Sequence, residues 1–431
     1  MCLCGCPGLV VLSSCCLAHD ERTVKKSPFL LLLAESVISV PVIEQVNHQK
    51  IPPCKHTCEH SPEIMSSDTI RVGFLGASTI AHKVWAAIEA AGNMQVTLVG
   101  SRSVKVAQKF IDECTESLHI SEERKAAAAT YDEVVGSSNV DVVYMSIPVT
   151  TRHEWVMKCA ENNKHVVGEK PPASTPAQLQ SWIEALSAKG LLYMDGTMFS
   201  HGPYVKKVVE LLPEIGDIRR MTFIFSFRAS PERLQSDIRC NPNLEPLGAL
   251  GDIGWYGIRS FLHMVDFTMP TTVAGRILEE LPNGAVTSFK GELTFPGAKP
   301  DTSIYAYFYC SFLSSLQQSF IVSGTKGRIV AEQLTSPLTD AGAACFKIVK
   351  PTFSGPDPST DVTVEQTVTN VQVPEETGHM QETQMWRDVR DCLKKDESGR
   401  LIAEEDAVRE WARKSWMTHC IAAKLMESAR S

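Results

Sequence analysis

The sequence contains no stretch of 18 or more apolar residues, which is about the length that a helix needs to cross a bilayer. We therefore expect no membrane span. It also lacks a long run of Lys or Arg and carries a formal net charge of -8, which argues against nucleic acid as the main partner. The 431 residues are 21% charged and 43% hydrophobic, a composition typical of a soluble globular protein, and the length suits two domains.

A disulfide framework is missing as well. Seven of the 14 cysteines lie before residue 60, and the other seven are scattered singly along the chain. Several of these, such as Cys159, Cys310 and Cys420, have apolar neighbours. Isolated thiols of this kind are typical of a reducing, intracellular compartment, so we expect a cytoplasmic protein.

Residues 1–65 do not resemble the rest of the chain. The apolar run Gly8–Ala18 has the length of a signal-peptide core, but no Lys or Arg precedes it. The run Phe29–Ile43 is interrupted by Glu35 and is too short to span a bilayer. We expect a leader that is disordered or absent from the mature protein, with a targeting peptide as the alternative.

The same leader contains residue types that bind zinc, in the segment Cys54-Lys-His56-Thr-Cys58-Glu-His60. No second cluster accompanies it, so we expect no metal site. Met65 directly precedes the first good strand pattern and could be the true start of the protein.

From residue 70 onward, short apolar runs alternate with helical patterns. Largely apolar strands that alternate with helices are typical of a parallel sheet covered on both faces. The sequence therefore predicts an α/β Rossmann domain over about residues 66–196. The expected strands are Ile70–Leu75, Gln95–Gly100, Val140–Ile147, His165–Gly168 and Leu191–Met194, and the later helices are Val104–Glu113, Thr151–Glu161 and Thr175–Lys189.

After residue 196 the pattern changes to alternating or aromatic runs separated by turn residues, which predicts one large, mainly antiparallel sheet. Helices are expected at Ala249–Val265, Gln381–Lys394 and Glu404–Ala429. We therefore expect an α+β domain over residues 197–431 that holds the substrate. A broad sheet with one face not obviously covered by helices favours a homodimer through that face.

The turn after the first strand is the first candidate for a binding site. Gly76-Ala77-Ser78-Thr79-Ile80-Ala81 follows a strand and opens a helix, as the dinucleotide pattern Gly-x-Gly-x-x-Gly/Ala does, with Ser78 in place of the middle glycine. Gly76 permits a tight turn, and Ser78 is small enough to let a pyrophosphate approach the helix amides. The alternative is a plain tight turn.

The end of the second strand bears on the choice of cofactor. An NAD site normally has Asp or Glu there, to bind the ribose hydroxyls. This chain has Ser101-Arg102, and a guanidinium can bind a 2′-phosphate that a carboxylate would repel. We therefore expect NADP(H) rather than NAD(H), with a solvated arginine as the alternative.

Charged residues also follow the strand His165–Gly168, where Glu169 and Lys170 precede two prolines. Ligands of open α/β sheets bind just beyond the carboxyl ends of the strands, so this pair stands where chemistry is expected. The alternative is a surface ion pair before a proline turn.

Asp252 and Tyr256 lie four residues apart, so a helix would place both side chains on one face. A phenol with a nearby ammonium can act as general acid or base because the cation lowers the pKa of the phenol. Lys170 is the natural candidate for that cation. The alternative is a buried tyrosine beside an N-capping aspartate.

Taken together, three motifs in this order and spacing resemble the glucose–fructose oxidoreductase/inositol dehydrogenase (Gfo/Idh/MocA) family, over about residues 70–429. The similarity is strongest to the branch that contains glucose–fructose oxidoreductase and the dihydrodiol and D-xylose dehydrogenases. The motifs are Gly76–Ala81, Glu169–Pro171 and Gly248–Tyr256.

The resemblance implies roles for individual residues. Lys170 would contact the substrate and the nicotinamide ribose, Asp252 would position the substrate hydroxyl, and Tyr256 would carry the proton. Other branches have His at the position of Tyr256, so the tyrosine indicates the branch that acts on sugars and dihydrodiols. Ser200 replaces an arginine of many relatives, so the identity of the substrate is not predicted. The implied cofactor-binding residues are Gly76, Ala77, Ser78, Thr79, Ile80, Ser101, Arg102, Ile147, Pro148, His153, Glu169 and Lys170.

The sequence thus predicts an NADP(H)-dependent oxidoreductase. Hydride would pass between the nicotinamide and a CH–OH or C=O group of a sugar, polyol or cyclic diol. The alternative is a catalytically idle NADP-binding regulator of the same superfamily. Loss of Lys170 or Tyr256 would favour the regulator, and both residues are present.

Overall fold

The computed structural model describes residues 69–332, 334–335, 343–354, 363–374 and 381–431. The expectations for the leader, which concern the apolar runs, the Cys/His segment and Met65, lie outside these residues. Within them, no helix combines the length and the apolar character that a membrane span requires.

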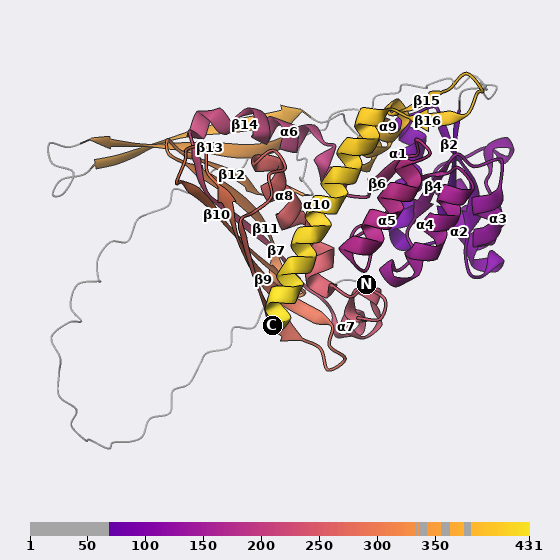
Figure 1. The fold of residues 1–431 in the computed structure, drawn as a ribbon, viewed down its shortest axis with the longest axis horizontal. Helices are drawn as coiled ribbons and strands as arrows, with labels where there is room; N and C mark the ends of the chain where they lie inside the picture. Colours follow the sequence, from indigo (N-terminus) through magenta and orange to yellow (C-terminus); the bar gives the residue numbers. More distant parts are fainter. Residues whose placement is uncertain (1–68, 333, 336–342, 355–362, 375–380) are drawn as a thin grey trace, which may run out of the picture. The chain divides into compact units, whose positions relative to one another are not determined.

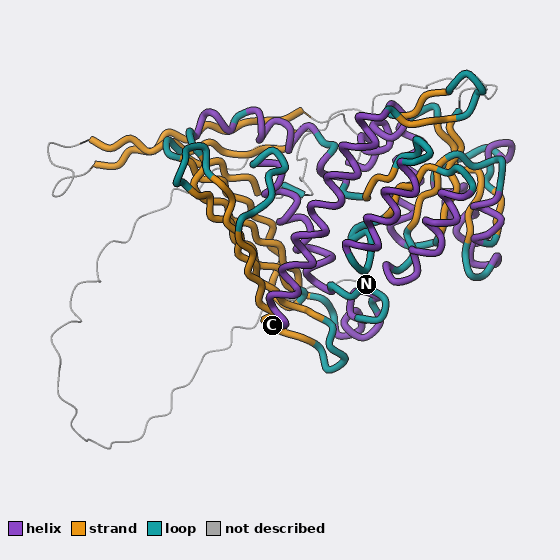
Figure 2. The backbone as a smooth tube through the Cα atoms, in the orientation of Figure 1, coloured by secondary structure: helices purple, strands orange, loops and turns teal. Residues whose placement is uncertain are grey.

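The first sheet is parallel and has the strand order β3-β2-β1-β4-β5-β6 (Figures 1 and 2). The order reverses between β1 and β4, and ligands of such sheets bind at this point, outside the carboxyl ends of the strands. The predicted Rossmann-like sheet is confirmed. Its strands are β1 (Ile70–Leu75), β2 (Met94–Gly100), β3 (Ala127–Ala129), β4 (Val142–Met145), β5 (His165–Gly168) and β6 (Tyr193–Asp195).

Helices cover both faces of this sheet. α1 (Thr79–Ala91) and α2 (Val104–Ser117) share one buried core with it, whereas α3 (Tyr131–Gly136), α4 (Arg152–Glu161) and α5 (Pro176–Ser187) share another. Apolar side chains on both sides of each strand make this arrangement necessary, because either face would otherwise meet water.

Local signals in the sequence fix the start of α5. The Thr175 hydroxyl accepts a hydrogen bond from the Gln178 amide at 3.2 Å, and Pro176 occupies the first helical position. Proline fits there because its missing N–H would have no partner inside the helix. The predicted cap and proline are both confirmed.

The second sheet is large and mainly antiparallel, as predicted, with the order β14-β13-β12-β11-β7-β10-β9-β8. Only the β7–β10 pair among its described pairings is parallel. Its strands are β7 (Ile218–Arg228), β8 (Thr272–Glu280), β9 (Val286–Pro296), β10 (Ser303–Ser311), β11 (Leu313–Gly324), β12 (Arg328–Glu332), β13 (Ala343–Ser354) and β14 (Thr363–Pro374).

Helices pack on one face of this second sheet. α8 (Trp255–Met264) and α10 (Glu405–Arg430) share the buried core with its strands. The approach of α10 to β8 is so close that a Cβ added to Gly275 would lie 2.0 Å from the Leu425 carbonyl oxygen. The shorter helices of this region are α6 (Pro203–Glu210) and α7 (Pro231–Ser236).

The single helix expected over Ala249–Val265 is divided in two. A π-helical turn, Leu250–Gly254, precedes α8. Glycine at positions 251 and 254 allows this turn to pack tightly, because a Cβ at either position would lie about 3 Å or less from neighbouring side chains.

The C-terminal helices bring the chain back to the first sheet. α9 (Gln381–Asp391) packs along α1, and its Met385, Trp386 and Val389 belong to the buried core of the first sheet. The predicted helix to Lys394 ends earlier, because Leu393–Lys395 forms strand β15, which pairs with β16 (Leu401–Ala403).

A buried ion pair joins the two sheets. Arg259 Nη2 of α8 donates to Asp195 Oδ2 of β6 at 2.6 Å, and both side chains are 1% exposed. The Ser415 hydroxyl of α10 donates to the same carboxylate at 2.5 Å. Breaking such a pair would leave an uncompensated buried charge, so it fixes β6, α8 and α10 against one another.

Candidate active site

A cleft of about 670 Å³ opens where β1, β4 and β5 end. The first sheet contributes the turn before α1, the ends of β4 and β5, and the start of α4. The segment between β7 and α8 contributes the other wall. Seven of the residues that the sequence singles out line the cleft, namely Ser78, Thr79, Ile80, Ile147, Glu169, Lys170 and Asp252.

The turn before α1 has the conformation that its glycine was expected to permit. Gly76 has φ +108°, and an added Cβ would lie 2.8 Å from the Ser146 hydroxyl oxygen. Its amide donates to the Gly100 carbonyl at 3.0 Å, which joins the carboxyl ends of β1 and β2. A side chain at this position would be strained whatever its size.

Ser78 stands at the N-cap position of α1, but its side chain caps no helix amide. The Ser78 Oγ atom is buried and has no hydrogen-bond partner among the described residues. Buried hydroxyls normally find a partner, and a helix N-terminus attracts anions. This turn therefore fits a bound phosphate group, although Gly76 and Ala77 themselves do not line the cleft.

Ser101 and Arg102 follow β2, outside the cleft lining. The Ser101 amide donates to the Ala129 carbonyl at 3.2 Å. Arg102 is exposed, and it forms no ion pair with the residues that the structure describes. Its charge lies near Tyr131, where burial raises the pKa of the phenol and Arg102 opposes that rise.

The structure brings Lys170 and Asp252 together in a buried ion pair. Lys170 Nζ donates to Asp252 Oδ1 at 2.7 Å and to the Asp252 backbone carbonyl at 2.6 Å. Arg239 Nε contacts the same Oδ1 atom at 2.8 Å. The Lys170 and Asp252 side chains are only 8% and 9% exposed.

These neighbours keep the pair ionised. Burial alone would raise the pKa of Asp252, but Lys170 and Arg239 lower it to about 2. Burial is the largest single effect on Lys170 and lowers its pKa, but Asp252 and Tyr256 together raise it, and the net direction is upward. Lys170 is therefore a fixed cation at neutral pH.

Tyr256 lies against the same ammonium. Lys170 Nζ is 4.8 Å from the centroid of the Tyr256 ring, and the phenol donates to Met198 Sδ at 3.7 Å. Burial raises the pKa of Tyr256, and the opposing effect of Lys170 is smaller. The expected lowering of the phenol pKa by the cation is thus present but outweighed by burial.

Glu169 points away from this pair. Its Oε1 atom accepts a hydrogen bond from the Tyr144 hydroxyl at 2.8 Å. Burial raises the pKa of Glu169, against the lowering effects of Lys170 and the Tyr144 bond. A Cβ at Gly196 would lie 3.0 Å from Oε1, so glycine there leaves room for the carboxylate.

His153 takes part in a different contact. Its Nδ1 atom accepts a hydrogen bond from the indole of Trp182 in α5 at 2.7 Å, and the two rings are stacked. Neither His153 nor Pro148 lines the cleft, whereas Ile147 does.

Arg152 organises the loop after β5 and was missed by sequence reasoning. The guanidinium is 3% exposed and donates to the backbone carbonyls of Ile147 at 2.8 Å and Pro171 at 2.7 Å. It also donates to the carbonyls of Glu169 and Pro172. Only its position in the first turn of α4, next to His153, was available as a signal, and a solvated arginine would have the same pattern.

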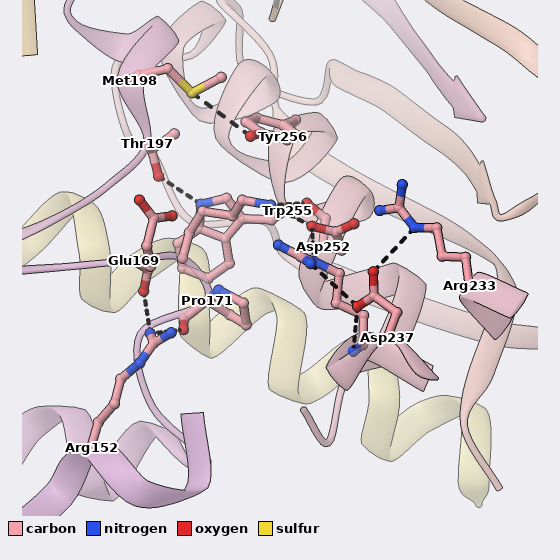
Figure 3. A network of polar contacts seen from close by, with 12 residues as sticks. Arg152, Glu169, Pro171, Thr197, Met198, Arg233, Asp237, Asp252, Trp255 and Tyr256 are labelled. Carbon is pink, nitrogen blue, oxygen red and sulfur yellow. Dashed lines mark hydrogen bonds and ion pairs between the residues drawn. The ribbon is translucent and has the colours of Figure 1, made fainter. Parts of the chain in front are cut away.

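A second missed contact holds the start of α8. The Trp255 indole donates to the Thr197 hydroxyl at 2.8 Å (Figure 3). That hydroxyl donates in turn to Asp195. Trp255 precedes Tyr256 in the chain, so this contact fixes the helix that carries the phenol.

Two family models match this chain. Residues 70–197 match the family model described as an oxidoreductase family with an NAD-binding Rossmann fold, and residues 205–330 match the Gfo/Idh/MocA C-terminal domain. The chain belongs to the Gfo/Idh/MocA family. It is an oxidoreductase of this family, as the resemblance implied.

Individual relatives share less than a third of their aligned residues with this chain. A dTDP-3,4-didehydro-2,6-dideoxy-α-D-glucose 3-reductase from Actinomadura kijaniata is 31% identical over 198 residues, which cover 45% of this chain and 56% of the relative. A D-xylose 1-dehydrogenase (NADP(+)) from Haloferax volcanii is 27% identical over 263 residues, 60% of this chain and 74% of the relative.

A solved structure shares the fold. The 3-ketoreductase KijD10 from A. kijaniata, crystallised with NADP and TDP-benzene, superimposes with a TM-score of 0.66 at 24% identity. The alignment covers 83% of this chain and 97% of the ketoreductase.

Proposed function

We propose that this protein is an NADP(H)-dependent oxidoreductase that transfers hydride between the nicotinamide and a CH–OH or C=O group of a sugar, polyol or cyclic diol. The observation that carries the proposal is the contact of one buried ammonium, Lys170, with both Asp252 and Tyr256 at the edge of a parallel sheet. A fixed cation beside a phenol is the arrangement that proton transfer to or from a carbinol oxygen requires.

Each of the three side chains has a distinct task in this proposal. In the reducing direction, the Tyr256 hydroxyl gives its proton to the carbonyl oxygen, and the resulting phenolate is stabilised by Lys170 before solvent protonates it again. Asp252 holds Lys170 in place and accepts a hydrogen bond from a substrate hydroxyl. When bound, the reduced cofactor supplies the hydride at C4 of its nicotinamide, and its oxidised form accepts one.

The cofactor would lie across the turn Gly76–Ile80. The uncapped start of α1 and the unpartnered Ser78 hydroxyl support a diphosphate there, with Ile147, Pro148, His153 and Glu169 proposed along its path. The exposed Arg102 supports NADP(H) over NAD(H). The D-xylose dehydrogenase has NADP(+) in its name, and the ketoreductase was crystallised with NADP, which also supports NADP(H) here. Residues 66–196 would thus hold the cofactor, and residues 197–431 the substrate.

Turnover is the experiment that tests this proposal. We expect the purified protein to oxidise NADPH with at least one aldose, dicarbonyl or diketosugar, or to reduce NADP⁺ with an aldose or cyclic diol. Fluorescence-detected NADPH binding without turnover on any of them would instead support the idle regulator.

The choice of cofactor has its own test. Arg102→Ala should weaken NADPH binding about tenfold or more and leave NADH binding almost unchanged, because only NADPH carries the 2′-phosphate. Equal losses for both nucleotides would contradict the role of Arg102.

A further inference from the structure

We propose that the substrate of this oxidoreductase carries an anionic group, a carboxylate or a phosphate, and that Arg233 and Arg239 bind it. This inference rests on the proposed function and narrows its substrate class. It starts from a line of charged side chains that leads out of the site along one wall of the cleft.

The line alternates in charge from the interior to the surface. Lys170 pairs with Asp252 at 2.7 Å, and Asp252 pairs with Arg239 at 2.8 Å. Asp237 then lies 3.3 Å from Arg239 and 3.1 Å from Arg233. Figure 3 shows Asp237 between Asp252 and Arg233. All five side chains line the cleft.

The two arginines are more exposed than the inner pair, whereas Asp237 between them is 16% exposed. The Lys170 and Asp252 side chains are 8% and 9% exposed, whereas those of Arg239 and Arg233 are 35% and 44% exposed. The inner end is where the proposed chemistry occurs, and the outer end is open to a ligand.

The charges of this line do not cancel. Three cations share two carboxylates, so Asp237 serves two guanidinium groups and Asp252 serves an ammonium and a guanidinium. Arg239 contacts both carboxylates and Arg233 contacts only Asp237, and each guanidinium keeps further donors because arginine has five N–H groups. The least compensated cation of the line is therefore Arg233, at the mouth.

Arg233 is held in place for such a contact. Its guanidinium lies over the ring of Phe227 at 4.7 Å, and its backbone amide donates to the Ser230 cap of α7. An arginine whose planar group rests on an aromatic face loses little freedom when it binds an anion.

The other carboxylates at the cleft leave Arg233 to Asp237 alone. Glu245 accepts a hydrogen bond from the Val149 amide at 3.2 Å, and Glu169 accepts one from Tyr144. Burial raises the pKa of both. Both lie near Arg152, and in addition Glu169 lies near Lys170 and Glu245 near Arg239, whereas Arg233 has an ion pair only with Asp237 among the described residues.

A substrate with its carbinol at Lys170 and Tyr256 can follow the line outward and place an acidic group at Arg239 and Arg233. A neutral sugar would leave those donors to water. A cationic substrate would meet repulsion. Acid sugars, sugar phosphates and sugar nucleotides all have the required chemistry.

The test compares matched ligands on the full-length protein. D-glucose, D-glucuronate and D-glucose 6-phosphate differ in charge on one scaffold, and calorimetry reports their binding with and without NADPH, independently of turnover. The variants are Arg233→Gln, Arg233→Lys and, as control, Arg430→Gln, since Arg430 pairs with Glu280 away from the cleft and is 51% exposed.

We expect wild type to bind one of the anionic ligands at least about tenfold more tightly than D-glucose. Arg233→Gln should remove most of that preference while D-glucose binding changes less than about twofold, Arg233→Lys should restore part of it, and Arg430→Gln should leave it intact. Which anionic ligand shows the effect decides between carboxylate and phosphate.

Two results would overturn the inference. The first is that wild type binds D-glucose as tightly as both anionic ligands. The second is that Arg233→Gln weakens binding of NADPH and not of the sugars, which would assign Arg233 to a cofactor phosphate. Failure of the proposed function looks different, because the protein would then not bind NADPH or would bind it without turnover.

Discussion

Asp252 is the residue on which the ion pairs of the site converge. Its carboxylate is shared by Lys170 and Arg239, and without it the buried Lys170 ammonium would lose its charged partner. Asp252 is therefore expected to matter for stability as well as for the placement of Lys170.

We predict that Asp252→Asn lowers the free energy of unfolding by about 3 kcal/mol at pH 7, because two cations lose their buried partner. The pKa of Asp252 is about 2 in the folded state and near 4 in the unfolded chain. The stabilisation is therefore complete above about pH 4 and is lost as pH falls toward 2.

Urea unfolding of both proteins at pH 7 and pH 3 measures this effect. The difference in free energy of unfolding between wild type and Asp252→Asn should be large at pH 7 and smaller at pH 3. Asp406→Asn is the control, since Asp406 is 93% exposed and pairs only on the surface of α10. A difference that does not change with pH would contradict the assignment.

For single residues, the sequence predicts the charged and polar motifs of the site but not the groups with which they interact. Lys170, Asp252 and Tyr256 could be singled out because each follows a strand end or lies in a family motif. Arg152 and Arg239 could not, since their roles depend on carbonyls and carboxylates that approach only in the folded chain.

The loop after β5 is the element that carries Lys170, and one buried arginine holds it. Two prolines keep this loop out of any regular structure, so its carbonyls need donors from elsewhere. Arg152 supplies them from α4.

We predict that Arg152→Met lowers the free energy of unfolding by about 2–4 kcal/mol, because several buried carbonyls lose their donor. It should also lower kcat/KM at least about tenfold, since Lys170 would lose its position. Arg152→Lys should fall close to Arg152→Met, because an ammonium cannot reach all the carbonyls that the guanidinium binds.

Urea unfolding and steady-state kinetics measure the two effects. Arg124→Met provides a matched control, because Arg124 is 43% exposed and pairs with Glu89 outside the cleft. The role given to Arg152 would be contradicted if Arg152→Met kept the kcat/KM of wild type, or if Arg152→Lys were as stable as wild type.

Elements were predictable where patterns were strong. The apolar runs of β1 and β5 gave their bounds, and Thr175 and Pro176 gave the start of α5. Strand β14 was not predicted because its four valines, at 364, 368, 371 and 373, are irregularly spaced and show no steady period-two alternation. The π-helical turn at Leu250–Gly254 depends on tight packing that no local pattern encodes.

At the scale of the whole molecule, the second sheet has a face that no described helix covers. Strand β10 presents Tyr305 and Tyr307 there, 62% and 44% exposed, and the register places Thr222 of β7 beside Tyr307. Exposed aromatic side chains on a broad sheet favour association with another copy.

We predict a homodimer through this face, as the sequence suggested. Light scattering after gel filtration should give twice the mass of one chain for wild type. The double variant Tyr305→Glu/Tyr307→Glu should give the mass of one chain, because dimerisation would bury its added negative charges. Val106→Glu is the control, since Val106 is 50% exposed on α2. A wild-type monomer would contradict the prediction.

The proposed chemistry depends on residues from both parts of the molecule that meet at one point: Lys170 follows β5, and Tyr256 lies in the first turn of α8. The contact of the Lys170 ammonium with the Tyr256 ring carries the proposed chemistry. Removal of the phenolic hydroxyl alone tests this most directly, because the ring and its packing remain.

The decisive measurement is kcat and NADPH affinity of Tyr256→Phe beside a Tyr307→Phe control, with any substrate that wild type turns over. We expect a loss in kcat of about 10²–10⁴-fold for Tyr256→Phe, with the NADPH Kd within about twofold of wild type. Wild-type turnover by Tyr256→Phe would contradict this expectation.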